Sequence, residues 1–131
     1  MSQTRSADDS SVLVERTAGL TAVLGAFIMA SAVVFTITGN MGLHNVLVGA
    51  VTAFVASVHA YRNGESRTQT IAFAAILVLL GIWIAASPFV FGIDRELVIG
   101  INSLGGAIIA ILSLVGVYGS VRTSDTTATT A

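Results

Sequence analysis

Cysteine and lysine are absent from this chain of 131 residues, and proline occurs once. Without cysteine the chain has no disulfide framework, thiolate nucleophile, cysteine-ligated zinc or iron–sulfur cluster. All six basic residues are arginine and the formal net charge is −1, so no polybasic run exists to bind nucleic acid or anionic lipid. We therefore expect no nucleic-acid partner.

Charge of either sign is also scarce, because only 10% of the residues are charged, against about 25% in a typical soluble domain. No Asp, Glu, Lys or Arg occurs in 18–61, 68–93 or 97–121. Hydrophobic residues make up 54% of the chain, and the mean hydropathy is +0.88. This composition predicts an integral membrane protein in contact with the lipid bilayer.

Four apolar runs are long enough to cross a hydrocarbon core of about 30 Å as helices, at about 1.5 Å per residue. The short loops between them favour antiparallel neighbours, so the predicted fold is all-α, a bundle of four transmembrane helices. The predicted spans are 18–37, 43–61, 69–91 and 97–120. The predicted organisation is a polar, mobile tail (1–17), a helical hairpin (18–62), a loop (63–68), a second hairpin (69–120) and a Thr-rich, mobile tail (121–131).

The distribution of arginine predicts the orientation of these spans. Five arginines lie in the two tails and the 62–68 loop, whereas the opposite side carries only Arg95. Positive charge marks the cytoplasmic side, so we expect a multi-pass protein of the cell membrane with both termini in the cytoplasm. A cleaved signal peptide ending near Ala32 is the alternative for the first span, but the apolar run continues to Ile37.

The two halves of the chain resemble each other. At an offset of 56 residues, Gly25 pairs with Gly81 and Ser31 with Ser87; further identities at offsets of 56 and 57 include Ile28 with Ile84, Asn45 with Asn102, Gly49 with Gly106 and Tyr61 with Tyr118. This pattern predicts two tandem two-helix repeats. Since each has an even number of spans, both insert in the same direction, unlike the inverted repeats of many transporters.

The run from Gly81 to Gly92, which contains Ser87-Pro88-Phe89, resembles the SPW repeat family of prokaryotic integral membrane proteins. That family is named for a Ser-Pro-Trp motif late in a membrane helix, which is often present twice. The resemblance covers residues 20–120. Here Phe89 replaces the tryptophan, and the first copy reads Ser31-Ala32-Val33. The resemblance implies a fold and leaves the mechanism open.

Pro88 has no backbone N–H, so the carbonyl of Ile84 loses its helical partner and we expect a kink in the third span. An unpaired carbonyl is costly in hydrocarbon. We expect the Asn102 amide to donate to this carbonyl or to Ser87, with Asn45 and Ser31 as the equivalent pair. Such residues either hold helices together or bind a substrate, and we favour the packing role.

Small residues at helical spacing predict the faces on which helices approach closely. The predicted contact residues are Gly49, Ala53, Gly81, Gly106 and Ala110, and a stripe of Ala18, Ala22, Ala26 and Ala30 predicts the face of the first span. The alternative is that one stripe faces another protein. Tyr61 and Tyr118 close their helices and are predicted to anchor them in the headgroup layer.

The sequence contains no pattern typical of a catalytic or metal site. Both histidines lie on one predicted helix, and their Cα atoms are about 22 Å apart at about 1.5 Å per residue, too far to share an ion. We expect His44 and His59 to be interfacial, with haem at a dimer axis as the alternative. We predict no catalytic residues, metal or cofactor, and no enzyme activity.

The leading hypothesis is a structural or accessory membrane protein, acting as a homo-oligomer or as a subunit of a larger membrane complex. The alternative is a passive channel or carrier for a small neutral solute, formed by oligomerisation. A polar stripe facing a symmetry axis would favour the channel, whereas the same residues satisfied within one protomer would favour the accessory role. These residues are Asn45, Thr52, Ser57, Asn102 and Ser113.

Overall fold

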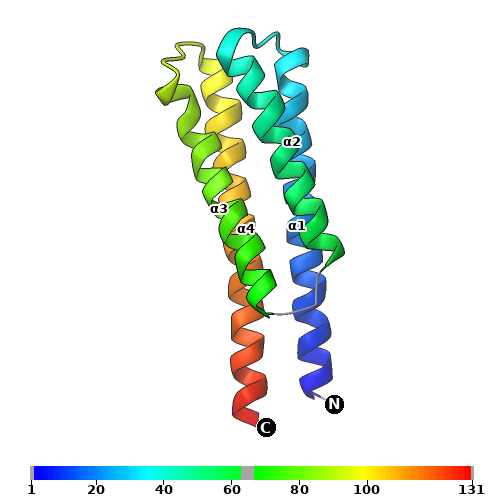
Figure 1. The fold of residues 1–131 in the computed structure, drawn as a ribbon. Coiled ribbons are helices and arrows are strands. Elements are labelled where there is room, and N and C mark those ends of the chain that lie inside the picture. The colour runs from blue at the N-terminus through cyan, green and yellow to red at the C-terminus, as the bar shows by residue number, and fades with distance from the viewer. Residues whose placement is uncertain (1, 63–66, 131) are drawn as a thin grey trace.

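The computed structural model describes residues 2–62 and 67–130, and helices are the only regular secondary structure in these ranges (Figure 1). The helices are α1 (Ser2–Val34), α2 (Gly39–Tyr61), α3 (Arg67–Val90) and α4 (Glu96–Thr130). Residues 63–66, most of the predicted loop 63–68, lie outside the described residues. The all-α prediction is thus confirmed over the described ranges.

Four segments of these helices are long and apolar enough to cross a membrane: Val12–Val34, Gly39–Tyr61, Thr68–Val90 and Glu96–Gly119. The chain is therefore a multi-pass membrane protein. The first span begins six residues before the predicted start at 18 and includes Glu15 and Arg16, both exposed. The backbone of α1 and α4 also continues as helix into the two segments predicted to be polar tails. Extending an existing helix costs much less free energy than nucleating a new one.

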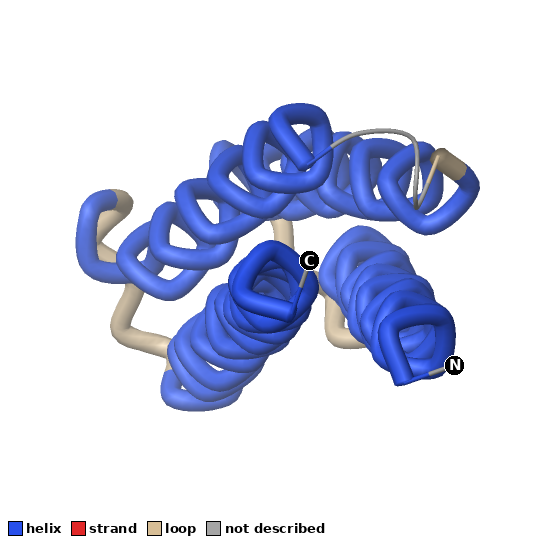
Figure 2. Tube along the Cα trace, turned by 90° about the horizontal axis from the view of Figure 1, so that it is seen from below, coloured by secondary structure: helices blue, strands red, loops and turns tan. Residues whose placement is uncertain are grey.

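Each helix packs most extensively on its neighbour within a hairpin, α1 on α2 and α3 on α4. Between the hairpins, α1 packs on α4 more extensively than α2 packs on α3. The end-on view shows α1 and α4, whose ends carry the N and C labels, side by side (Figure 2). The loop between α1 and α2 and the loop between α3 and α4 lie at the same end of the bundle (Figure 1).

The same backbone turn ends α1 and α3. In the first, Ile37 N–H donates to Ala32 O at 2.8 Å around Thr36, whose φ is +52°. In the second, Ile93 N–H donates to Pro88 O at 2.8 Å around Gly92, whose φ is +64°. These are Schellman caps, which place one residue in the left-handed region. The two caps are 56 positions apart, the offset at which the halves of the sequence match.

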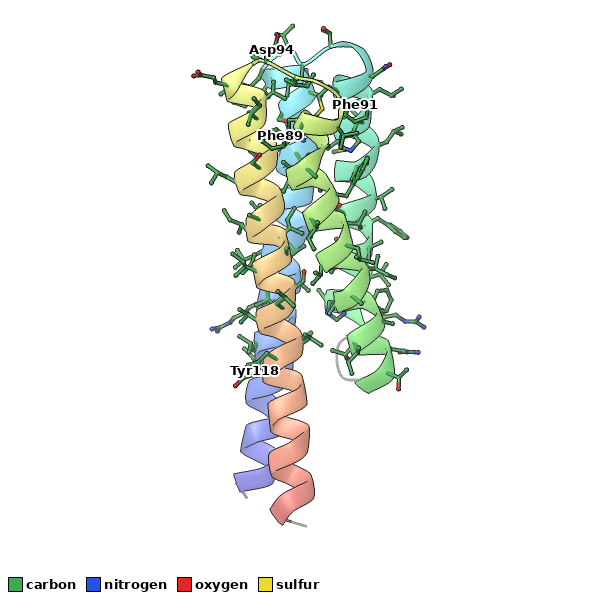
Figure 3. All side chains as sticks on the ribbon, turned by 90° about the vertical axis from the view of Figure 1, so that its left-hand side faces the viewer. Phe89, Phe91, Asp94 and Tyr118 are labelled. Carbon is green, nitrogen blue, oxygen red and sulfur yellow. The ribbon has the colours of Figure 1, made fainter. Side chains whose placement is uncertain are left out.

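The interior is formed by a small aliphatic cluster and several polar residues. Ile28, Ile84 and Ile109 are fully buried together, and Leu24, Val48 and Ile101 pack around them. Large apolar side chains cover much of the outside of the bundle instead (Figure 3). This inversion is expected where hydrocarbon surrounds the protein.

Candidate functional site

Two asparagines meet in the interior and join the hairpins. Asn45 lies on α2 and Asn102 on α4, and both side chains are fully buried. Asn45 Nδ2 donates to Asn102 Oδ1 at 3.0 Å, and Asn102 Nδ2 donates to Asn45 Oδ1 at 2.8 Å. A reciprocal amide pair of this kind holds two helices in one register without placing charge in the membrane.

Each asparagine uses its second N–H to reach a serine of its own hairpin. Asn102 Nδ2 donates to Ser87 Oγ at 3.2 Å, and Asn45 Nδ2 donates to Ser31 Oγ at 3.4 Å. Both serines are buried. All four amide N–H groups of the pair thus have acceptors, which is the condition for a polar network to stabilise an interior.

The serine hydroxyls end the network on backbone carbonyls. Ser87 Oγ donates to Ile84 O at 2.7 Å, which supplies the partner that Pro88 cannot provide. Ser31 Oγ donates to Ile28 O at 2.6 Å, although Ala32 follows it and supplies an N–H. Asn102 therefore acts on the freed carbonyl through Ser87. Pro88 lies in the last turn of α3, so little helix remains beyond it to be redirected.

Phe89 occupies the position of the family's tryptophan, and it points away from the network. Its side chain is 66% exposed, whereas Ser87 and Pro88 are buried. Figure 3 places Phe89 near Phe91 and Asp94, at the end of the bundle with the short loops. The motif therefore contributes two residues to the interior and one aromatic ring to the membrane-facing surface.

His44 is part of this site, which the prediction of an interfacial histidine missed. Its side chain is only 9% exposed, and its Nδ1 lies 3.1 Å from Asn45 Oδ1. Its ring packs against Trp83 at 5.8 Å and Phe91 at 5.3 Å between ring centroids. Nε2 is buried and has no hydrogen-bond partner among the described residues. The first hairpin alone has this histidine, since Ile101 stands at the equivalent position.

Most of the polar residues considered as a pore lining are buried within the protomer. Thr52 and Ser113 are buried, like the asparagine pair, and Ser113 Oγ donates to Ile109 O at 2.8 Å. Thr52 Oγ1 is buried and has no partner in the described part of the chain. Ser57 alone of the five is exposed.

The five predicted contact residues lie at two close backbone approaches. A Cβ added at Gly81 would lie 2.7 Å from Ala110 N, and Gly106 would meet Gly81 and Ala85. In the first hairpin, a Cβ added at Gly25 would lie 2.6 Å from Ala53 N, and one at Gly49 would lie 2.7 Å from Gly25 O.

Gly25, which the predicted alanine stripe does not include, makes a close contact of α1 with α2. The predicted stripe is wrong at its end, because Ala30 is exposed. A spacing of four residues drifts around a helix of 3.6 residues per turn, so the stripe leaves the contact face. The identity of Gly25 and Gly81 at an offset of 56 residues is the sequence feature that could have predicted this contact.

The remaining predicted positions lie toward the opposite end from the short loops. Tyr61 is 91% and Tyr118 66% exposed, and Figure 3 shows Tyr118 far from Asp94. His59 is buried and stacks on Phe73 at 5.4 Å, so it is not an exposed interfacial side chain. No group of three or more His, Cys, Asp or Glu able to hold a metal occurs within the described residues.

Comparison with known proteins identifies a family for this chain. Neither the curated proteins nor the solved structures contain a match to this chain. The family model of the SPW repeat domain matches residues 15–116, which include the second and third spans, most of the first and fourth, and the whole asparagine network. With its late-helix Ser87-Pro88 and four apolar helices, the chain belongs to the SPW repeat domain family.

Proposed function

We propose that this protein is a structural or accessory component of the cell membrane, and not an enzyme, acting as a homo-oligomer or as a subunit of a larger membrane complex. The observation that carries the proposal is the reciprocal Asn45–Asn102 pair. Its polar groups are used to join the two hairpins of one chain. They are therefore not available to bind a solute at this depth.

The chemistry of the spans also supports this role. The stretches 18–61, 68–93 and 97–121 contain two histidines but no Asp, Glu, Lys or Arg. Proton-coupled carriers and pumps usually hold carboxylates or basic groups inside the membrane, because such residues are costly and retained for function. A bundle whose long central stretches lack carboxylates and arginines is better suited to packing against lipid or protein.

A passive channel or carrier for a small neutral solute is the alternative. Two hydroxyls of α2 favour it: Thr52 is buried and has no partner among the residues that the structure describes, and Ser57 is exposed. An oligomer with Ser57 at its axis would expose a polar position to a lumen. Against it stands the burial of Asn45, Asn102 and Ser113 inside the protomer.

Native mass spectrometry after gentle extraction from the host membrane tests the role. Stoichiometric association with a different, larger membrane protein, or a homo-oligomer of fixed copy number that passes no solute in liposomes, agrees with the proposal. Flux of small neutral solutes through liposomes containing the purified protein, abolished by Ser57→Leu, would establish the channel instead. The matched control is Thr68→Leu, which removes an exposed hydroxyl of α3.

A further inference from the structure

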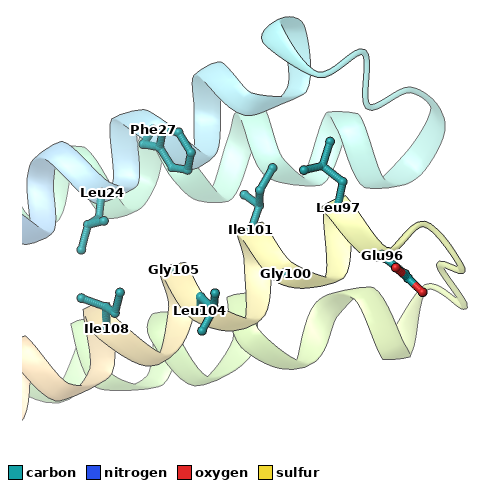
Figure 4. Close-up of a pocket in the computed structure, with 9 residues that line it drawn as sticks. All are labelled: Leu24, Phe27, Glu96, Leu97, Gly100, Ile101, Leu104, Gly105 and Ile108. Carbon is teal, nitrogen blue, oxygen red and sulfur yellow. The ribbon is translucent and has the colours of Figure 1, made fainter.

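An apolar groove of about 700 Å³ runs between α1 and α4 on the outside of the bundle (Figure 4). Leu24 and Phe27 of α1 form one wall, and four large aliphatic residues of α4 form the other: Leu97, Ile101, Leu104 and Ile108. Glu96 lies at one end of the groove and is its one charged lining residue. This groove does not overlap the asparagine network.

The groove exists because α4 has glycine where α2 has larger residues. Gly100 and Gly105 line it, and at the matching offset of 57 the second helix has Leu43 and Val48. A Cβ added at Gly100 would have nothing within 4 Å. On the α2–α3 side the position matching Phe27 is Trp83, which packs on His44. The two sides of the bundle are therefore unequal at this depth.

We propose that this groove binds one acyl chain of a phospholipid whose headgroup carries an amine, with phosphatidylethanolamine as the expected ligand. From Glu96 to Ile108 the groove follows about 18 Å of helix at about 1.5 Å per residue. Half of a hydrocarbon core of about 30 Å is about 15 Å. The groove thus matches the depth of one leaflet, with Glu96 at the headgroup level.

The walls suit a flexible chain better than a second helix. Close helix packing in membranes needs small residues repeated every four positions. The face of α4 that begins at Gly100 continues with Leu104 and Ile108, so only its first position is small. An acyl chain follows an uneven aliphatic channel without needing such a stripe.

Charges of both signs lie at the headgroup end. The Glu96 carboxylate attracts a cation, and the headgroup amine of phosphatidylethanolamine supplies one. Arg95 directly precedes α4 and reaches toward the end of α1, where its Nη1 donates to Thr36 O at 3.3 Å. Its guanidinium places positive charge near the lipid phosphate. A lipid with both charges complements this end, and phosphatidylglycerol, which has no amine, does not.

The test is lipid retention, measured by native mass spectrometry on protein released from nanodiscs of equimolar phosphatidylethanolamine and phosphatidylglycerol. We expect one retained phosphatidylethanolamine per wild-type chain. Gly100→Leu fills the groove and lowers retention of both lipids about tenfold, which corresponds to ~1.4 kcal/mol. Gly19→Leu is the matched control, because a Cβ at Gly19 also meets nothing within 4 Å and Gly19 lies outside the groove. Glu96→Gln retains lipid but loses the headgroup preference.

Three results would overturn the inference. Equal retention by Gly100→Leu and the wild type would place the lipid elsewhere. Equal retention of both lipids by the wild type would remove the role of Glu96. A wild-type dimer that Gly100→Leu separates, while Gly19→Leu does not, would show that a second copy occupies the groove. None of these results depends on whether the protein is an accessory subunit or a channel.

Discussion

At the scale of single residues, the serine before Pro88 compensates for a hydrogen bond that the proline removes. The proline removes the N–H that would pair with Ile84 O, and the Ser87 hydroxyl takes that place at 2.7 Å. Ser31 makes the same bond to Ile28 O, but Ala32 still supplies an N–H there. The two serines therefore make the same hydrogen bond, but only Ser87 pairs a carbonyl that has lost its helical N–H donor.

This difference predicts the effect of removing each hydroxyl. Ser87→Ala should lower the free energy of unfolding in detergent by about 1 kcal/mol more than Ser31→Ala, because only Ser87→Ala leaves a buried carbonyl unpaired. Pro88→Ala restores the N–H, so in that background the cost of Ser87→Ala should fall to that of Ser31→Ala. Equal costs in all backgrounds would contradict this account of the motif.

The third position of the motif gives a different prediction. Phe89 is 66% exposed, so a larger ring at this position meets membrane and not the core. Phe89→Trp should change the free energy of unfolding by less than about 0.5 kcal/mol, as for other surface substitutions. Thermal unfolding in detergent measures it, and a loss comparable to that of a core substitution would show that the ring packs inward.

At the scale of helices, each hairpin is held by one glycine-lined crossing. Gly25 meets α2 near Gly49, and Gly81 meets α4 near Gly106. Since hydrocarbon surrounds the helices, burial of apolar surface adds little to their association, and close backbone approach is what remains. The asparagine pair then joins the two hairpins to each other.

Alanine substitution separates these glycines from those on open surface. Gly25→Ala and Gly81→Ala should each lower the free energy of unfolding by about 1–3 kcal/mol, because the added Cβ meets backbone atoms that cannot move aside. Gly100→Ala should be neutral or stabilising by up to about 1 kcal/mol, as expected for a helical glycine in open space. Similar effects at all three positions would contradict the close approach.

Much of the fold was predictable, because four charge-free apolar runs of this length admit few other structures. The pairing of each asparagine with the serine of its own hairpin was also predictable, but the hydrogen bonds between Asn45 and Asn102 were not. The ends of the helices were less predictable. The apolar run continues to Ile37, but α1 ends at Val34 because the Schellman cap around Thr36 turns the chain there.

Contacts between elements explain the other differences. His44 was predicted to be interfacial because it lies near the start of its span, yet Trp83 and Phe91 of the other hairpin cover it. Pairings of this kind depend on how the hairpins pack and leave no periodic signal in the sequence. The tandem duplication stays a prediction, supported by the equivalent caps, glycine crossings and serine bonds of the two hairpins.

At the scale of the whole molecule, the orientation in the membrane can be tested directly because the chain has no cysteine. Gly64→Cys, in the loop predicted to be cytoplasmic, should resist a membrane-impermeant maleimide in intact cells and react after lysis. Asp94→Cys should react in intact cells, since a single arginine marks its side. The reverse pattern would place both termini outside.

The central claim is that the buried polar residues join the two hairpins of one chain. The most direct test is a double-mutant cycle of Asn45→Leu and Asn102→Leu, read as the free energy of unfolding in detergent. Each single variant leaves the other amide without its partner asparagine, whereas the double variant removes both amides. We expect a coupling energy of about 1 kcal/mol, with the double variant less destabilised than the sum of the singles. Strictly additive losses would show that the two amides do not stabilise the protein as a pair.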